Sequence, residues 1–215
     1  WAGSMSGLNE RLTYTNIPKK HVVDIFGFPP FSALLRPAET ILVDTLTFHR
    51  TYHYTLSLHI NHVIFLHTYL YGVFLLLVAV GPSLLAVGTL MYACYTLLLT
   101  RAALPWMLPY VAMLLMLAGA ARENSQCCSW ASSTTGWAAL GIILGSFGCQ
   151  LIGHACLEIF VAPPSLHHGF LAAPPLEYLS FLARCGVQPA LHSLVMQRVE
   201  ALRENAARVI ASKTE

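Results

Sequence analysis

The chain has 215 residues, of which 56% are hydrophobic and only 10% are charged. Soluble domains carry about 25% charged residues, so this composition, with a mean hydropathy of +0.60, predicts a membrane protein. The net charge of +2 comes from basic residues near the two ends, without an Arg-rich face or an aromatic platform, and this pattern argues against nucleic acid as a partner.

Residues 1–47 read as a polar N-terminal arm in which charged residues, glycines and prolines mix, as in FGFPPF at 26–31. We expect this arm to lie on the surface or against a partner. Its first residues lack the apolar core of a signal peptide. A removed mitochondrial presequence and a trimmed chain would each account for a start at Trp1.

Four apolar segments follow, and each comes close to the roughly 20 apolar residues that a spanning helix needs. They lie at about 62–80, 84–100, 103–121 and 137–159, and a GPS turn separates the first two. The predicted fold class is therefore all-α: an integral membrane protein with four transmembrane helices plus interfacial and amphipathic helices.

The distribution of basic residues favours an even number of spans. Of the 12 Lys and Arg residues, five lie before residue 51 and five after residue 183. Arg101 follows the second apolar segment, and only Arg122 would fall on the opposite side of the membrane. By the positive-inside rule, we expect both ends of the chain on the same side.

The fourth apolar segment has small residues at Gly141, Gly145 and Cys149. A G-x-x-x-G pattern allows another helix to approach closely, although glycines also occur incidentally in apolar helices. Gly153, later in the same segment, would leave room beside His154 for close approach.

The C-terminal region mixes apolar and charged residues. Residues 163–175 read as a Pro-rich loop, and residues 176–195 read as an interfacial segment instead of a fifth span, because they include Glu177, Arg184 and Pro189. Residues 186–215 are predicted to hold a C-terminal amphipathic helix that lies on a membrane surface or packs on a partner. Its apolar stripe comprises Val195, Val199, Leu202, Ala206 and Val209.

Histidines are concentrated before and within the first apolar segment. Five of the ten lie in FHRTYHYTLSLHINHVIFLH at 48–67, and His154 and Glu158 stand one helical turn apart in QLIGHACLEIF. Histidine is a common metal ligand, and ionisable groups at membrane depth are usually functional. Two interpretations stay open: a site for iron, zinc or copper, or interfacial histidines that are hydrogen-bonded to their neighbours.

These motifs resemble those of the membrane family of 2-hydroxy fatty acid dioxygenases, known from fungal phytosphingosine breakdown. The resemblance covers roughly residues 48–185, which we take as the four-helix membrane domain. The matching residues are Tyr52-His53, His62, Gln150, Gly153, His154 and Glu158.

The resemblance implies an iron(II)-dependent enzyme that uses dioxygen for α-oxidation, shortening a 2-hydroxy fatty acid by one carbon. It implies that His53, His62 and His154 bind the metal and that Glu158 supports or completes the site. The expected partners are then membrane lipids and a 2-hydroxy fatty acid substrate.

The chain also departs from the family pattern. The family usually places Asn-Pro and a second Asn between its first two histidines, whereas residues 54–58 read YTLSL. On an unbroken helix, the nine residues from His53 to His62 turn about 900°, which puts the two side chains on opposite faces. A helix break is therefore required if both bind one metal.

The second departure follows Glu158, where the basic residues of the family are absent from IFVAPPSL. The alternative function is thus an inactive relative that serves as a structural accessory subunit of a large membrane complex, such as a mitochondrial respiratory or ATP synthase complex. The expected location is the mitochondrial inner membrane or the endoplasmic reticulum.

Overall fold

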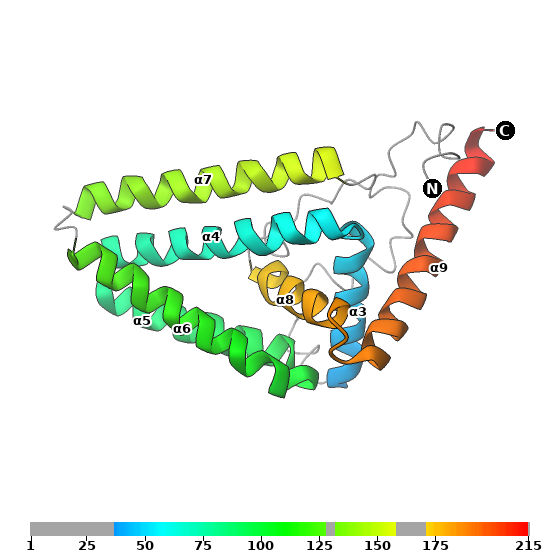
Figure 1. The fold of residues 1–215 in the computed structure, drawn as a ribbon, viewed down its shortest axis with the longest axis horizontal. Helices are drawn as coiled ribbons and strands as arrows, with labels where there is room; N and C mark the ends of the chain where they lie inside the picture. The colour runs from blue at the N-terminus through cyan, green and yellow to red at the C-terminus, as the bar shows by residue number, and fades with distance from the viewer. Residues whose placement is uncertain (1–36, 128–131, 158–170, 215) are drawn as a thin grey trace.

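The structure is a computed structural model that describes residues 37–127, 132–157 and 171–214 (Figure 1). Within these ranges the chain is helical, and no strand occurs. Most of the predicted polar arm, most of the Pro-rich loop and Glu158 lie outside them, so the predictions for those segments stay predictions.

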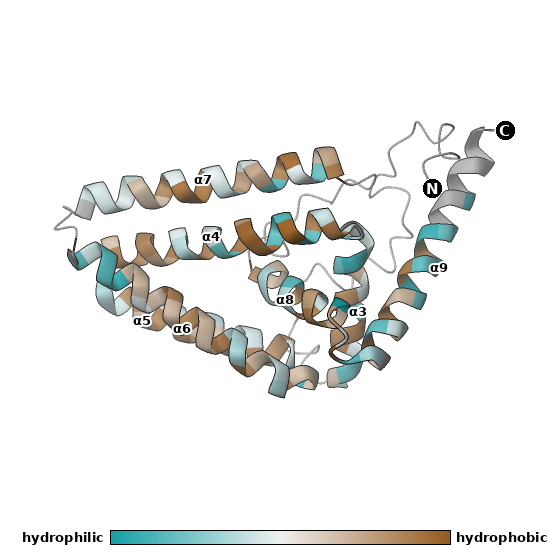
Figure 2. Cartoon of the chain, in the orientation of Figure 1, coloured by the Kyte–Doolittle hydropathy of each residue, from teal (hydrophilic) through white to brown (hydrophobic). Residues whose placement is uncertain are grey.

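Among the described residues, four helices are long and apolar enough to span a membrane, which confirms the predicted all-α membrane fold. They are α4 (Leu56–Val80), α5 (Pro82–Leu99), α6 (Leu104–Cys127) and α7 (Ser132–Leu157), with the short 3₁₀ helix η2 (Arg101–Ala103) before α6. Gly81 alone separates α4 from α5, and Pro82 opens α5, a position where proline's missing N–H has no cost. Brown, apolar residues predominate along these four helices in Figure 2.

Helices α4 and α7 lie side by side along their lengths (Figure 1). Gly72 permits a close approach, because a Cβ atom there would lie 2.9 Å from Ile143 Cγ1. A Cβ atom at Gly141 or Gly145 would meet no atom of the described residues within 4 Å. The G-x-x-x-G pattern is therefore not the surface by which α7 contacts α4.

Three further helices gather at the end of the spans where α4 begins and α7 ends (Figure 1). They are α3 (Ala38–Tyr52), α8 (Ala173–Arg184) and α9 (Pro189–Thr214). Helix α8 has 12 residues, too few to span a membrane, so it is not a fifth span. It contacts α3, α4 and α6, and most of its side chains are buried. The arm boundary expected at residue 47 falls inside α3.

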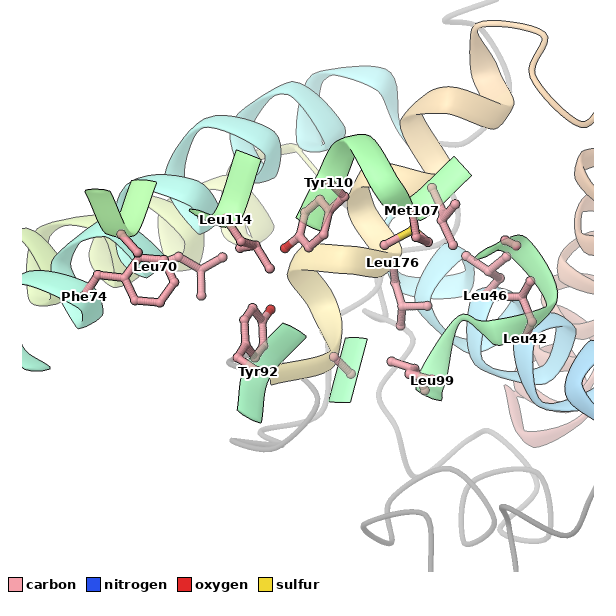
Figure 3. Close-up of a cluster of buried hydrophobic side chains, with 14 of the residues drawn as sticks. Leu42, Leu46, Leu70, Phe74, Tyr92, Leu99, Met107, Tyr110, Leu114 and Leu176 are labelled. Atoms are coloured by element: carbon pink, nitrogen blue, oxygen red, sulfur yellow. The ribbon is translucent and has the colours of Figure 1, made fainter. Parts of the chain in front are cut away.

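A shared hydrophobic core holds α3 and α8 against the spans (Figure 3). Leu42 of α3, Met107 and Tyr110 of α6, and Leu176 of α8 are all buried in it. Because this core joins helices from both ends of the sequence, it fixes α3 and α8 relative to the first residues of α4, where the histidines are concentrated.

The amphipathic helix α9 packs on α3 of the same chain. Val195 and Val199 of its predicted apolar stripe are 4% and 0% exposed. At the edge of this contact, Arg198 Nη1 donates to Asp44 Oδ1 at 2.9 Å. The first half of the stripe is therefore covered by α3, a contact within the chain that the sequence interpretation did not include.

Candidate metal site

His53, His62 and His154 converge at the end of the spans. Each offers one ring nitrogen, and these three atoms lie within 4.8 Å of one another. His62 Nε2 and His154 Nε2 are 3.1 Å apart. Two imidazole nitrogens that bind one metal at about 2.0–2.1 Å are separated by roughly 2.8–3.4 Å for angles between octahedral and tetrahedral. The structure thus brings together the three histidines that the resemblance indicated.

A break between α3 and α4 makes this convergence possible. Helix α3 ends at Tyr52, and α4 begins only at Leu56, so His53 lies in the break. Thr55 is the N-cap of α4 and accepts from the backbone N–H of Leu58 at 3.3 Å. The Thr55 hydroxyl also donates to the carbonyl of Leu157, at the end of α7, at 3.1 Å. The break between α3 and α4 is therefore made with an N-cap threonine, in a stretch that contains neither Asn nor Pro.

Three arginines from different helices bind the carbonyl groups around this break. Arg50 Nη1 of α3 donates to the carbonyl of His53 at 3.0 Å, Arg203 Nη1 of α9 donates to that of Thr51 at 3.3 Å, and Arg184 Nη2 of α8 donates to that of Tyr54. Carbonyl groups at a helix C-terminus lack partners within the helix, and cations there are favourable. The arginines thus stabilise the geometry that holds His53.

Backbone hydrogen bonds fix the proton positions on two of the histidines. His53 Nδ1 donates to the carbonyl of His49 at 2.8 Å, and His62 Nδ1 donates to that of Leu58 at 3.1 Å. A carbonyl only accepts, so each Nδ1 carries the hydrogen and each Nε2 keeps its lone pair. Burial, and then the neighbouring histidines, lower the pKa of His53 well below 6.5. The ring is therefore neutral, as metal binding requires.

The contact between His62 and His154 needs a cation or a proton. His62 Nε2 presents a lone pair to His154 Nε2 across 3.1 Å. Two lone pairs at this distance repel unless a proton or a metal ion lies between them. His154 Nδ1 is buried without a hydrogen-bond partner in the part of the chain that the structure describes. The ring nitrogens of the three histidines fit a metal that prefers imidazole ligands, such as iron, zinc or copper.

Glu177 of α8 is the carboxylate that the structure places among the histidines. Its side chain is 0% exposed; Oε2 pairs with His49 Nε2 and Oε1 with His59 Nδ1. Burial raises the pKa of Glu177 and lowers that of His49 to about 3. The sequence interpretation placed Glu177 at the interface. The available signal was a single carboxylate within the apolar stretch AAPPLEYLSFLA at 172–183.

Two further residues of the predicted site have different outcomes. Glu158, expected to support or complete the site, lies outside the residues that the structure describes, and its role stays a prediction. His67 lies further along α4, where Nδ1 donates to the carbonyl of Val63 and the ring stands 5.9 Å from that of Tyr110. His67 is not part of the converging group.

Gly153 makes room for a side chain of α4 beside His154, as the sequence predicted. A Cβ atom at residue 153 would lie 2.6 Å from Asn61 Oδ1, while Asn61 Nδ2 donates to the carbonyl of Cys149 at 3.3 Å. We expect Gly153→Ala to displace Asn61 and remove this hydrogen bond, costing about 0.5–1.5 kcal/mol of stability. The measurement is thermal unfolding in detergent.

The matched control is Gly141→Ala on the same helix, where the new methyl group meets nothing within 4 Å. This variant should unfold at the wild-type temperature or slightly above it, because alanine favours helix more than glycine does. Equal unfolding temperatures for the two variants would contradict a packing role for Gly153.

Comparison of the chain with protein-family models, curated proteins and solved structures gives no match.

Proposed function

We propose that this membrane protein is an iron(II)-dependent enzyme that oxygenates 2-hydroxy fatty acids, with His53, His62 and His154 as its metal ligands. The observation that carries the proposal is the convergence of these three ring nitrogens within 4.8 Å. The residues come from the α3–α4 break, from α4 and from the last turn of α7. Such a convergence of distant residues is what a metal site needs.

Iron is favoured among the metals by the family resemblance, and the donor set supports it. Three imidazole ligands leave other coordination positions open, which suits catalysis better than a closed structural site. When bound, iron(II) supplies the redox chemistry that reduces dioxygen. The chain's own part is to hold three neutral nitrogens in place and to keep them buried.

The location of the site supports an amphiphilic substrate. His53 lies just before the first span, His62 lies near the beginning of that span, and His154 lies near the end of the fourth. Both helices have these ends on the same side of the molecule (Figure 1). A fatty acid in a bilayer keeps its carboxylate at the interface and its chain among apolar helices. The polar head of such a substrate would thus lie at the level of the histidines.

The test is metal content and turnover of the wild-type protein. After purification in mild detergent without chelators, we expect about one iron per chain. Loaded with iron(II), the protein should consume one dioxygen per 2-hydroxy fatty acid and release CO2, water and the acid that is one carbon shorter, which is identified by mass spectrometry. The matched 3-hydroxy fatty acid should give no such product, because its hydroxyl group is on the wrong carbon.

A protein that is metal-free after this purification and takes up no iron(II) would exclude the enzyme. The accessory-subunit role in a large membrane complex would then be favoured, with the exposed Gly141 and Gly145 face as a contact surface. The proposal also includes a location in the mitochondrial inner membrane or the endoplasmic reticulum. Which of these two membranes contains the protein depends on which of the two roles is correct.

A further inference from the structure

We infer that Glu177 is a positioning residue for the metal site: its carboxylate joins α3 to α4 through His49 and His59 and thereby holds His53 opposite His62. This inference rests on the proposed function, because it assigns a role to Glu177 only if the three histidines bind a metal. Glu177 is not itself a ligand in this arrangement, since the converging group in the described part of the chain comprises His53, His62 and His154.

The two partners of Glu177 stand on opposite sides of the helix break. His49 precedes His53 by four residues, one turn of α3, and His59 precedes His62 by three residues, one turn of α4. Residues three and four apart are neighbours on a helix. A single carboxylate that pairs with both His49 and His59 therefore restrains the angle between the two helices close to both ligands.

His49 transmits the restraint to His53 in two ways. Its ring is stacked on the ring of His53, with centroids 4.1 Å apart and planes inclined by 12°. Its carbonyl accepts the Nδ1–H of His53 at 2.8 Å. A shift of His49 would thus change both the ring plane of His53 and the hydrogen bond that leaves Nε2 free for a metal.

Burial makes the contribution of Glu177 hard to replace. The side chains of Glu177, His49 and His59 are all 0% exposed, so bulk water does not reach them as a substitute partner. Burial raises the pKa of Glu177, and the nearby His59, Arg50 and Arg184 oppose that rise only in part. Arg50 and Arg184 also bind the carbonyl groups of His53 and Tyr54, so the same two arginines lie near the carboxylate and at the break.

The test uses Co(II) as the probe, because its visible spectrum reports ligand geometry. The full chain in detergent, stripped of metal, is titrated with Co(II) as wild type, Glu177→Gln and His49→Gln. Groups that orient a metal ligand typically contribute 10- to 100-fold in affinity. We expect the Co(II) affinity of both variants to fall by about that factor and their visible spectra to shift. Glu123→Gln, the same change at an exposed position of α6, should leave the Co(II) affinity and the visible spectrum unchanged.

The double variant Glu177→Gln/His49→Gln separates positioning from general loss of stability. If Glu177 acts through His49, the double variant should lose no more affinity than the weaker-binding single variant, because changes within one chain of contacts are not additive. Should Glu177→Gln not fold, His49→Gln alone answers the question, since it removes the link between Glu177 and His53.

Wild-type affinity and spectrum in Glu177→Gln, or in His49→Gln when only that variant folds, would overturn the inference and leave the proposed function standing. Additive losses in the double variant would also overturn it. A wild-type protein that binds neither Co(II) nor iron(II) would instead overturn the proposed function itself, and the inference with it.

Discussion

Replacing His62 with alanine is expected to reduce iron(II) affinity by more than about 100-fold, since even groups that only orient a ligand contribute 10- to 100-fold. His62 is 2% exposed, and its Nε2 lies 3.1 Å from that of His154. His53→Ala and His154→Ala should show losses of the same order, because each removes one of the three proposed ligands. Metal content after dialysis, measured by mass spectrometry, gives the result.

The matched control is His67→Ala, which makes the same change on the same helix outside the converging group. It should retain the wild-type metal content. Retention of iron in any one of the three ligand variants would remove that residue from the site, whereas equal losses in the His67 variant would indicate that the helix, and not the site, had been damaged.

Val199→Asp is expected to release α9 from α3 and to destabilise the protein strongly. Val199 is 0% exposed in the core that the two helices share. An uncompensated charge in such a place costs about 3–5 kcal/mol. Detachment of α9 would also remove Arg203 from the carbonyl of Thr51. Thermal unfolding in detergent and limited proteolysis between α8 and α9 measure the two effects.

Gln197→Asp introduces the same carboxylate at an exposed position of α9 and serves as the control. It should unfold near the wild-type temperature and resist proteolysis equally well. If Val199→Asp behaved in the same way, the packing of α9 on α3 would be wrong, and the stripe would be available for a membrane surface or a partner.

The four spans could be predicted because membrane insertion depends on the length and polarity of a continuous segment. The apolar runs are interrupted only by Gly81 and by segments that contain Arg101 and Arg122. The boundaries were less accurate: the first span begins at Leu56 instead of near residue 62. Polar residues such as His59 and Asn61 suggested a later start, but they face α8 and α7 within the protein.

The site was predicted less completely, because it depends on contacts between distant segments. YTLSL contains no proline or glycine, so the break that positions His53 was not apparent, although Thr55 is a residue that commonly starts helices. Glu177 could not be assigned to the histidines from sequence, since its burial requires α8 to pack against α3, α4 and α6 at once. Charge alone suggested an interfacial residue.

The arginines around the α3–α4 break have a consequence for biogenesis. Arg184 and Arg203 lie 130 and 152 residues beyond their carbonyl partners, and His154 lies 92 residues beyond His62. At synthesis rates of about 5–20 residues per second, the ribosome makes Arg203 roughly 8–30 s after Thr51. During that interval the first span lacks Arg203, and for most of it also lacks His154 and Arg184. If the three histidines bind a metal, as proposed, stable loading would therefore follow synthesis of the finished chain, and a ribosome stalled before α8 would hold a nascent chain without Arg184 and Arg203.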